Sequence, residues 1–73
     1  MHIIVKYLND DTKYNIYSFD KIRDNCIYLN CDYNKLTSLE PIKNLTQLQK
    51  LYCSYNQLTS LEPIRNLIQL KIL

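Results

Sequence analysis

The side chains in this sequence best suited to bind a metal or act as nucleophiles are three cysteines and one histidine. Cys26, Cys31 and Cys53 show no CxxC spacing, and His2 is the only histidine. Structural zinc sites draw their four ligands from such pairs, so we expect no metal site. The simplest interpretation is that the three thiols are free and pack as small apolar groups.

The other candidate catalytic groups do not form a recognisable set. The chain contains no glycine and therefore no glycine-rich loop that could hold a phosphate. Its seven acidic residues show no spacing that marks an acid–base pair, and its serines have no evident general base. We expect a protein that is not an enzyme and that uses no cofactor.

The charge pattern narrows the classes of partner. Nine basic and seven acidic residues give a net charge of +2, and the basic residues form no run of the kind that binds nucleic acid. No stretch approaches the ~20 apolar residues of a membrane span. The first residues lack a secretory cleavage site, and Lys6 interrupts their apolar run. We therefore expect a cytoplasmic protein in a reducing compartment, with no nucleic-acid or membrane partner.

Two consecutive segments of the chain are copies of one another. Residues 26–47 read CIYLNCDYNKLTSLEPIKNLTQ and residues 48–69 read LQKLYCSYNQLTSLEPIRNLIQ, with 14 of 22 positions identical. Residues 70–73 match the start of a third copy. An internal repeat of this length is typical of a solenoid, in which each copy packs only on its neighbours.

The apolar positions change their period within each copy. They alternate at first, as Leu29 and Cys31 do, which is the period of a β-strand. They then recur every three residues, which favours a 3₁₀-like or extended return segment. The inward positions are Leu29, Cys31, Leu36, Leu39, Ile42, Leu45 and Leu48, then Leu51, Cys53, Leu58, Leu61, Ile64, Leu67 and Leu70. Stacked copies predict a solenoid of parallel β-strands with a 3₁₀ or extended convex side.

The spacing of Leu48, Leu51, Cys53, Asn56 and Leu58 resembles the leucine-rich repeat. The repeat length and the tail LxxLxPIxNLxxL resemble the short class found in bacterial internalins. The run YCSYNQLTSLEPI most resembles leucine-rich-repeat proteins of amoeba-infecting giant viruses, and the wealth of residues with AT-rich codons agrees with that source. The resemblance covers residues 26–73 and implies a non-enzymatic protein-binding module, which here would be a viral protein in host cytoplasm.

Asn34 and Asn56 hold the same place in the two copies, just after the strand. A sharp turn there leaves backbone groups without sheet partners, and each buried unpaired group costs ~1–3 kcal/mol. One amide side chain can serve several such groups. The resemblance implies that these side chains form a ladder along the solenoid. Cys31 and Cys53 also share a place, but neighbouring parallel strands hold their Cβ atoms near ~4.8 Å, which is too far for a good disulfide.

The first 25 residues do not follow the repeat. Residues 2–8 and 14–19 read as two strands around the polar turn 9–13, which predicts a β-hairpin. Such a hairpin is well placed to cap the first coil, and a ligand-binding role is the alternative. We therefore divide the chain into a hairpin cap (1–25), repeat 1 (26–47), repeat 2 (48–69) and the start of a third repeat (70–73).

The resemblance also implies which side chains meet a partner, namely those on the exposed side of the strands. In this sequence they are Tyr28, Asn30, Asp32, Tyr33, Lys50, Tyr52, Ser54 and Tyr55. Tyrosine offers a large contact area with a polar tip and is common in interfaces, although exposed strand positions favour it in any case.

A second hypothesis concerns the apolar residues after the second repeat. Leu70, Leu73 and the inner side of the second copy, which includes Leu67, are expected to face water there, and the strand at 50–53 is expected to have little or no partner beyond it. The alternative function is therefore a truncated or degenerate repeat protein, or a structural piece that works only as a homo-oligomer joined through these residues.

Overall fold

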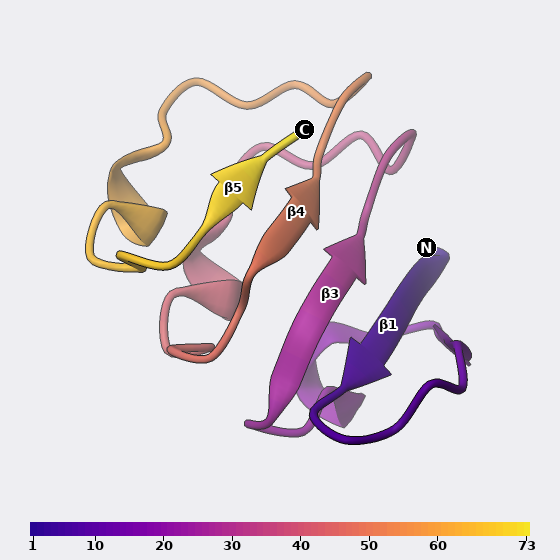
Figure 1. Cartoon of the computed structure of the whole chain (residues 1–73). Helices are drawn as coiled ribbons and strands as arrows, with labels where there is room; N and C mark the ends of the chain where they lie inside the picture. The colour runs from indigo at the N-terminus through magenta and orange to yellow at the C-terminus, as the bar shows by residue number, and fades with distance from the viewer.

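The computed structural model describes all residues, 1–73, as five short strands and three 3₁₀ turns. Figure 1 shows strands β1, β3, β4 and β5 side by side, with the return segments of the repeats looping behind them. The strands are β1 (Ile3–Tyr7), β2 (Tyr14–Ile16), β3 (Cys26–Asn30), β4 (Lys50–Tyr52) and β5 (Lys71–Ile72).

The strands form one open sheet in the order β2-β1-β3-β4-β5. Strands β3, β4 and β5 run parallel, as the repeat predicts, whereas β1 is antiparallel to both β2 and β3. The sheet is therefore mixed. Tyr28 lies opposite Lys50 and Leu29 opposite Leu51, so β3 and β4 pair in the register of the 22-residue copy.

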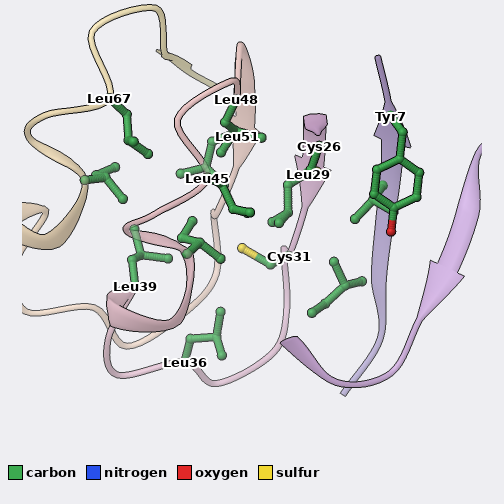
Figure 2. Packing of buried hydrophobic residues seen from close by; sticks show 14 residues of the cluster. Tyr7, Cys26, Leu29, Cys31, Leu36, Leu39, Leu45, Leu48, Leu51 and Leu67 are labelled. Carbon is green, nitrogen blue, oxygen red and sulfur yellow. The ribbon is translucent and has the colours of Figure 1, made fainter. Parts of the chain in front are cut away.

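The core lies between the sheet and the return segments. Figure 2 shows Leu29 and Leu51 from the strands with Leu36, Leu39 and Leu45 from the first return segment around the side chain of Cys31. All fourteen buried side chains are apolar, and no buried side-chain nitrogen or oxygen lacks a partner. The inward positions of the first repeat are thus confirmed. In the second repeat Cys53 and Leu58 are half-buried and Leu61 is exposed.

The return segments contain the 3₁₀ turns η2 (Glu40–Ile42) and η3 (Glu62–Ile64), at equivalent places in the two copies. A proline follows the first residue of each turn, where its fixed φ fits and its missing N–H is not needed. Each turn buries one isoleucine and carries an exposed glutamate. The prediction of 3₁₀ return segments is confirmed.

The N-terminal hairpin has shorter strands than predicted. β1 buries Ile3, Val5 and Tyr7 in strict alternation, but β2 ends at Ile16. Beyond it the Ser18 hydroxyl donates a hydrogen bond to the Asp20 carboxylate, and the chain turns into the 3₁₀ turn η1 (Phe19–Lys21). Local side-chain bonds of this kind compete with a sheet ladder. β1 covers the free edge of β3 through pairs from Ile4–Asn30 to Tyr7–Cys26.

The expectation that the strand at 50–53 has little partner beyond it is confirmed, because β5 has only two residues. β5 pairs with β4, and the N–H of Leu73 donates to the carbonyl of Leu51 at 2.8 Å. The register also departs from the repeat, because Ile72 and not Leu73 lies opposite Leu51. A shift of one residue exchanges the two faces of a strand. Ile72 thus takes the inward place that the repeat assigns to Leu73.

Candidate protein-binding face

The outward side of the sheet, called the strand face below, displays the side chains that alternate with buried Leu29 and Leu51. In β3 these are Tyr28 and Asn30, and in β4 they are Lys50 and Tyr52. The turn after each strand extends the face with Asp32 and Tyr33 in the first repeat and with Ser54 and Tyr55 in the second. The eight residues predicted to meet a partner therefore lie along two neighbouring strands and the turns that follow them.

The turns are held by Asn34 and Asn56. The Asn56 side-chain oxygen accepts the backbone N–H groups of Asn34 (3.0 Å) and Leu36 (2.9 Å). Its amide nitrogen lies within bonding distance of three carbonyls, those of Cys31, Cys53 and Ser54. One side chain thus satisfies backbone groups of both repeats, as the ladder hypothesis requires.

Asn34 repeats this arrangement one step toward the N-terminus. Its amide nitrogen lies within bonding distance of the carbonyls of Cys31 and Asp32 within its own repeat. It also exchanges two bonds of 2.9 Å with the backbone of His2, which precedes β1. The ladder therefore joins the hairpin to the repeats, a connection that the 22-residue period does not reveal because residues 1–25 lie outside it.

Two of the predicted contact residues also serve the backbone. The side-chain oxygen of Asn30 accepts the N–H of Asp32 at 3.0 Å, and a carboxylate oxygen of Asp32 accepts the N–H of Ser54 at 2.6 Å. These bonds fix the turn that carries the neighbouring tyrosines. A partner would reach these two polar side chains through their remaining lone pairs.

The tyrosines of the strand face form two pairs. Tyr33 and Tyr55 stack with their ring centroids 4.4 Å apart and their planes 6° from parallel. Tyr28 and Tyr52 meet at a tilt, with centroids 5.6 Å apart. The stacked rings are the more open pair, with relative exposures of 71% and 72%.

The stacked tyrosines also have left-handed backbones, with φ of 61° at Tyr33 and 57° at Tyr55. For an ordinary L-residue this region costs roughly 1–2 kcal/mol, and a bulky side chain there is uncommon. Both residues turn the chain just before a ladder asparagine, and the N–H of Tyr33 donates to the carbonyl of Ser54. The bend projects each ring into solvent beside its counterpart in the next repeat.

Three lysines that the repeat pattern does not identify surround the strand face. Lys6 lies opposite Tyr28 in the pairing of β1 with β3, and Lys71 lies opposite Lys50 in the pairing of β4 with β5. The ammonium of Lys13 lies 5.5 Å from the centre of the Tyr28 ring, within the range of a cation–π contact. Their placement depends on strand pairings that the repeat does not specify.

The three cysteines are unbridged. Burial raises the pKa of the Cys31 thiol to about 12 and that of Cys26 to about 11. Burial also raises the pKa of Cys53, which is only half-buried. Thiols with such raised pKa values are weak nucleophiles, and the Cys31 thiol instead donates to the carbonyl of Tyr52 at 3.3 Å.

No group of three or more histidine, cysteine or acidic side chains has the geometry to hold a metal ion. His2 stacks on Tyr17 with ring centroids 5.5 Å apart, and its Nε2 lies 2.7 Å from the side-chain oxygen of Asn15. None of the helical segments has the length and apolar character needed to cross a membrane.

Stacked strand–turn–3₁₀ units joined by an asparagine ladder define a repeat protein. A comparison with family models agrees, because the model described as "Leucine Rich repeats (2 copies)" matches residues 24–66, more than half of the chain. The chain therefore belongs to the leucine-rich-repeat family. Repeats of this family generally mediate interactions between proteins and are typically not enzymes. No match was found among curated proteins or among solved structures.

Proposed function

We propose that this protein is a non-enzymatic interaction module that binds a protein partner through the strand face. The observation that carries the proposal is the alignment of the two repeats, which gathers four tyrosines on one side of the sheet in two contacting pairs. Tyrosine supplies a large and fairly rigid contact surface, so ordering it on binding costs little conformational entropy. A standard interface needs about 800 Å² per partner, which would engage most of this face.

A site-specific cross-link tests this proposal. A photoreactive residue in place of Tyr52 is expected to trap a protein in cells of the native source, whereas the same residue in place of Glu62 on the convex side is not. The purified partner should then bind the full chain in calorimetry. Replacing Tyr33 and Tyr55 by serine should weaken that binding at least ~tenfold, as expected for contact residues near the centre of an interface. An affinity that is unchanged by both substitutions would contradict binding through the strand face.

We also propose a closer kinship within the leucine-rich-repeat family. The 22-residue copies and the cysteine at the third apolar position support kinship with the internalin-like short class and with giant-virus repeat proteins. A profile built from either group should align with both copies at Leu29 and Leu51 without gaps. Systematic gaps inside the copies would count against that kinship.

We propose self-association as a second candidate function, supported by a groove beside the second repeat in which five of the eight lining residues are hydrophobic. The groove measures about 510 Å³ and is lined in part by Leu61, Ile64, Leu67, Leu70 and Ile72. Leu67 and Leu70, two of the three residues predicted for self-association, line the groove, and Ile72 lines it where Leu73 was expected. Contrary to expectation Leu67 is itself buried, with 6% relative exposure, because it packs into the core. Exposed apolar surface of this kind is a common site of protein contact. Sedimentation over a wide range of protein concentration tests this candidate.

A further inference from the structure

We propose that the strand face selects an acidic partner, in the form of an extended polypeptide segment rich in carboxylates that lies across the strands. This inference rests on the proposed function and names the chemistry of its partner. It starts from the row of side chains that strand pairing places across the sheet. Lys6 lies opposite Tyr28, Tyr28 opposite Lys50, and Lys50 opposite Lys71.

The three lysines of the row, Lys6, Lys50 and Lys71, form no ion pair. Lys50 and Lys71 lie directly opposite each other on neighbouring strands, where like charges repel. The two ion pairs of the structure, Lys43 with Glu40 and Arg65 with Glu62, both lie on the return segments and involve no lysine of the row. A fold that otherwise satisfies its local rules tends to break them where it binds something.

Lys13 adds a fourth cation to this part of the strand face. Its ammonium lies over the ring of Tyr28. Because Tyr28 belongs to the row, this places a charge from the hairpin next to the row. Among the eight residues of the strand face, Asp32 is the one with an acidic side chain. It follows the C-terminal end of β3, where its carboxylate accepts the N–H of Ser54. The row is therefore a positively charged strip that contains Tyr28, and the other three tyrosines of the strand face lie beside it as an uncharged contact surface.

The dimensions of the strip fit an extended peptide. Strands lie about 4.8 Å apart, so the row from Lys6 to Lys71 spans about 14 Å. An extended peptide advances about 3.3 Å per residue and places alternate side chains on one side, so about five residues cover the row. Two or three carboxylates on that side would meet the lysines, and the intervening backbone would pass over Tyr28.

A titration followed by amide NMR shifts tests the inference on the full chain. The probe is a peptide of about ten residues that alternates glutamate and serine, long enough to span the row. The matched control replaces each glutamate by glutamine. We expect the glutamate peptide to shift the amides of Lys6, Tyr28, Lys50 and Lys71 at low salt, and salt above ~0.3 M to abolish the effect by screening.

Two charge-matched variants decide whether the row is the site. Lys50→Gln with Lys71→Gln should weaken peptide binding about tenfold, because the interaction depends on those charges. Lys21→Gln with Lys43→Gln removes the same charge outside the strand face and should change the affinity less than about twofold. Thermal melts of both variants verify folding, and relief of the Lys50–Lys71 repulsion should leave the first at least as stable as the wild type.

Several outcomes would overturn the inference. They are equal weakening by both variants, equal binding of the glutamine peptide, and tighter binding of an oligothymidine to the same residues. The inference would also be overturned if a partner cross-linked through Tyr52 had an affinity that changed neither with salt nor with the substitutions at Lys50 and Lys71. That result would leave the proposed function standing. Failure to trap any partner through Tyr52 would count against the proposed function and would not alter the peptide result.

Discussion

At the scale of single residues, Asn56 is the side chain that most directly joins the two repeats. It accepts two backbone N–H groups of the first repeat and lies within bonding distance of three carbonyls. Asn56→Ala leaves several of these groups unpaired in a half-buried site, so we expect a loss of ~1–3 kcal/mol in the free energy of unfolding. Urea titration measures this loss.

The control for that experiment is Asn66→Ala on the exposed return segment, which should change the free energy of unfolding by less than ~0.5 kcal/mol. The sequence alone predicts the same small effect for Asn30→Ala. The structure revises that expectation to a loss of ~0.5–1.5 kcal/mol, because the Asn30 oxygen accepts the N–H of Asp32. A loss for Asn66→Ala as large as that for Asn56→Ala would contradict the ladder.

The buried thiol of Cys31 makes stability depend on alkaline pH. Its pKa is about 12 in the folded chain against an ordinary value of 9.0, because burial disfavours the thiolate. Above pH 9 the unfolded chain therefore binds fewer protons than the folded chain, so stability falls as pH rises from 9 toward 12. Below pH 9 the contribution is fully present. Urea titrations across this range should show the decline.

Cys31→Val removes the titrating group while keeping an apolar side chain in the core. Its free energy of unfolding should therefore fall less steeply over the same pH range than that of the wild type. Thiol labelling at pH 8 gives a second measurement, in which half-buried Cys53 should react before Cys31 and Cys26. Rapid labelling of Cys31 in the native chain would show that its site is not closed.

At the scale of elements, the stacked rings of Tyr33 and Tyr55 couple one turn to the next. Aromatic pairs in such contact contribute ~0.5–1.5 kcal/mol beyond burial of their area. A double-mutant cycle with Tyr33→Ala and Tyr55→Ala should return a coupling energy in that range, since the rings lie 4.4 Å apart. Tyr17→Ala with Tyr55→Ala is the control, because Tyr17 stacks on His2 instead. Additive losses for the tyrosine pair would mean that the stack contributes nothing.

The elements of the repeats follow from the sequence because each has a local cause. The alternation at Leu29 and Cys31 indicates the strand, and the spacing of three around Ile42 indicates the 3₁₀ turn. The left-handed backbones of Tyr33 and Tyr55 could not be foreseen, since no glycine or other local signal marks them. The early end of β2 is followed by a hydrogen bond between Ser18 and Asp20, which propensity does not reveal.

At the scale of the whole molecule, pairing between distant segments determines which side chains lie next to one another on the sheet, and the sequence alone does not specify all of these pairings. The repeat specifies the parallel register of β3 and β4, and so the four tyrosines could be assigned to one face. It says nothing about the antiparallel pairing of β1 with β3, which brings Lys6 beside Tyr28. It also assigns Leu73 to the inward place that Ile72 occupies. The lysine row was missed for this reason, because it depends on both of these pairings.

The last prediction concerns association of whole molecules through the groove beside the second repeat. Two of its apolar lining residues are open to water, Leu61 at 47% and Ile72 at 44% relative exposure. Burying such surface against a second copy removes it from water, so association should stabilise the fold. The apparent melting temperature should therefore rise with protein concentration, and sedimentation over a ~hundredfold range should show dimers at its upper end.

Substitutions at apolar positions inside and outside the groove distinguish association through the groove from non-specific hydrophobic association. Leu61→Asp with Ile72→Asp places two carboxylates in the groove and should give monomers at every concentration, because burying unpaired charge is costly. Ile68→Asp is the control, since Ile68 is 92% exposed and does not line the groove. It should leave the dimer intact. A wild-type chain that stays monomeric, with a melting temperature independent of concentration, would show that the groove does not join two copies, and the strand face would then stand as the proposed binding surface.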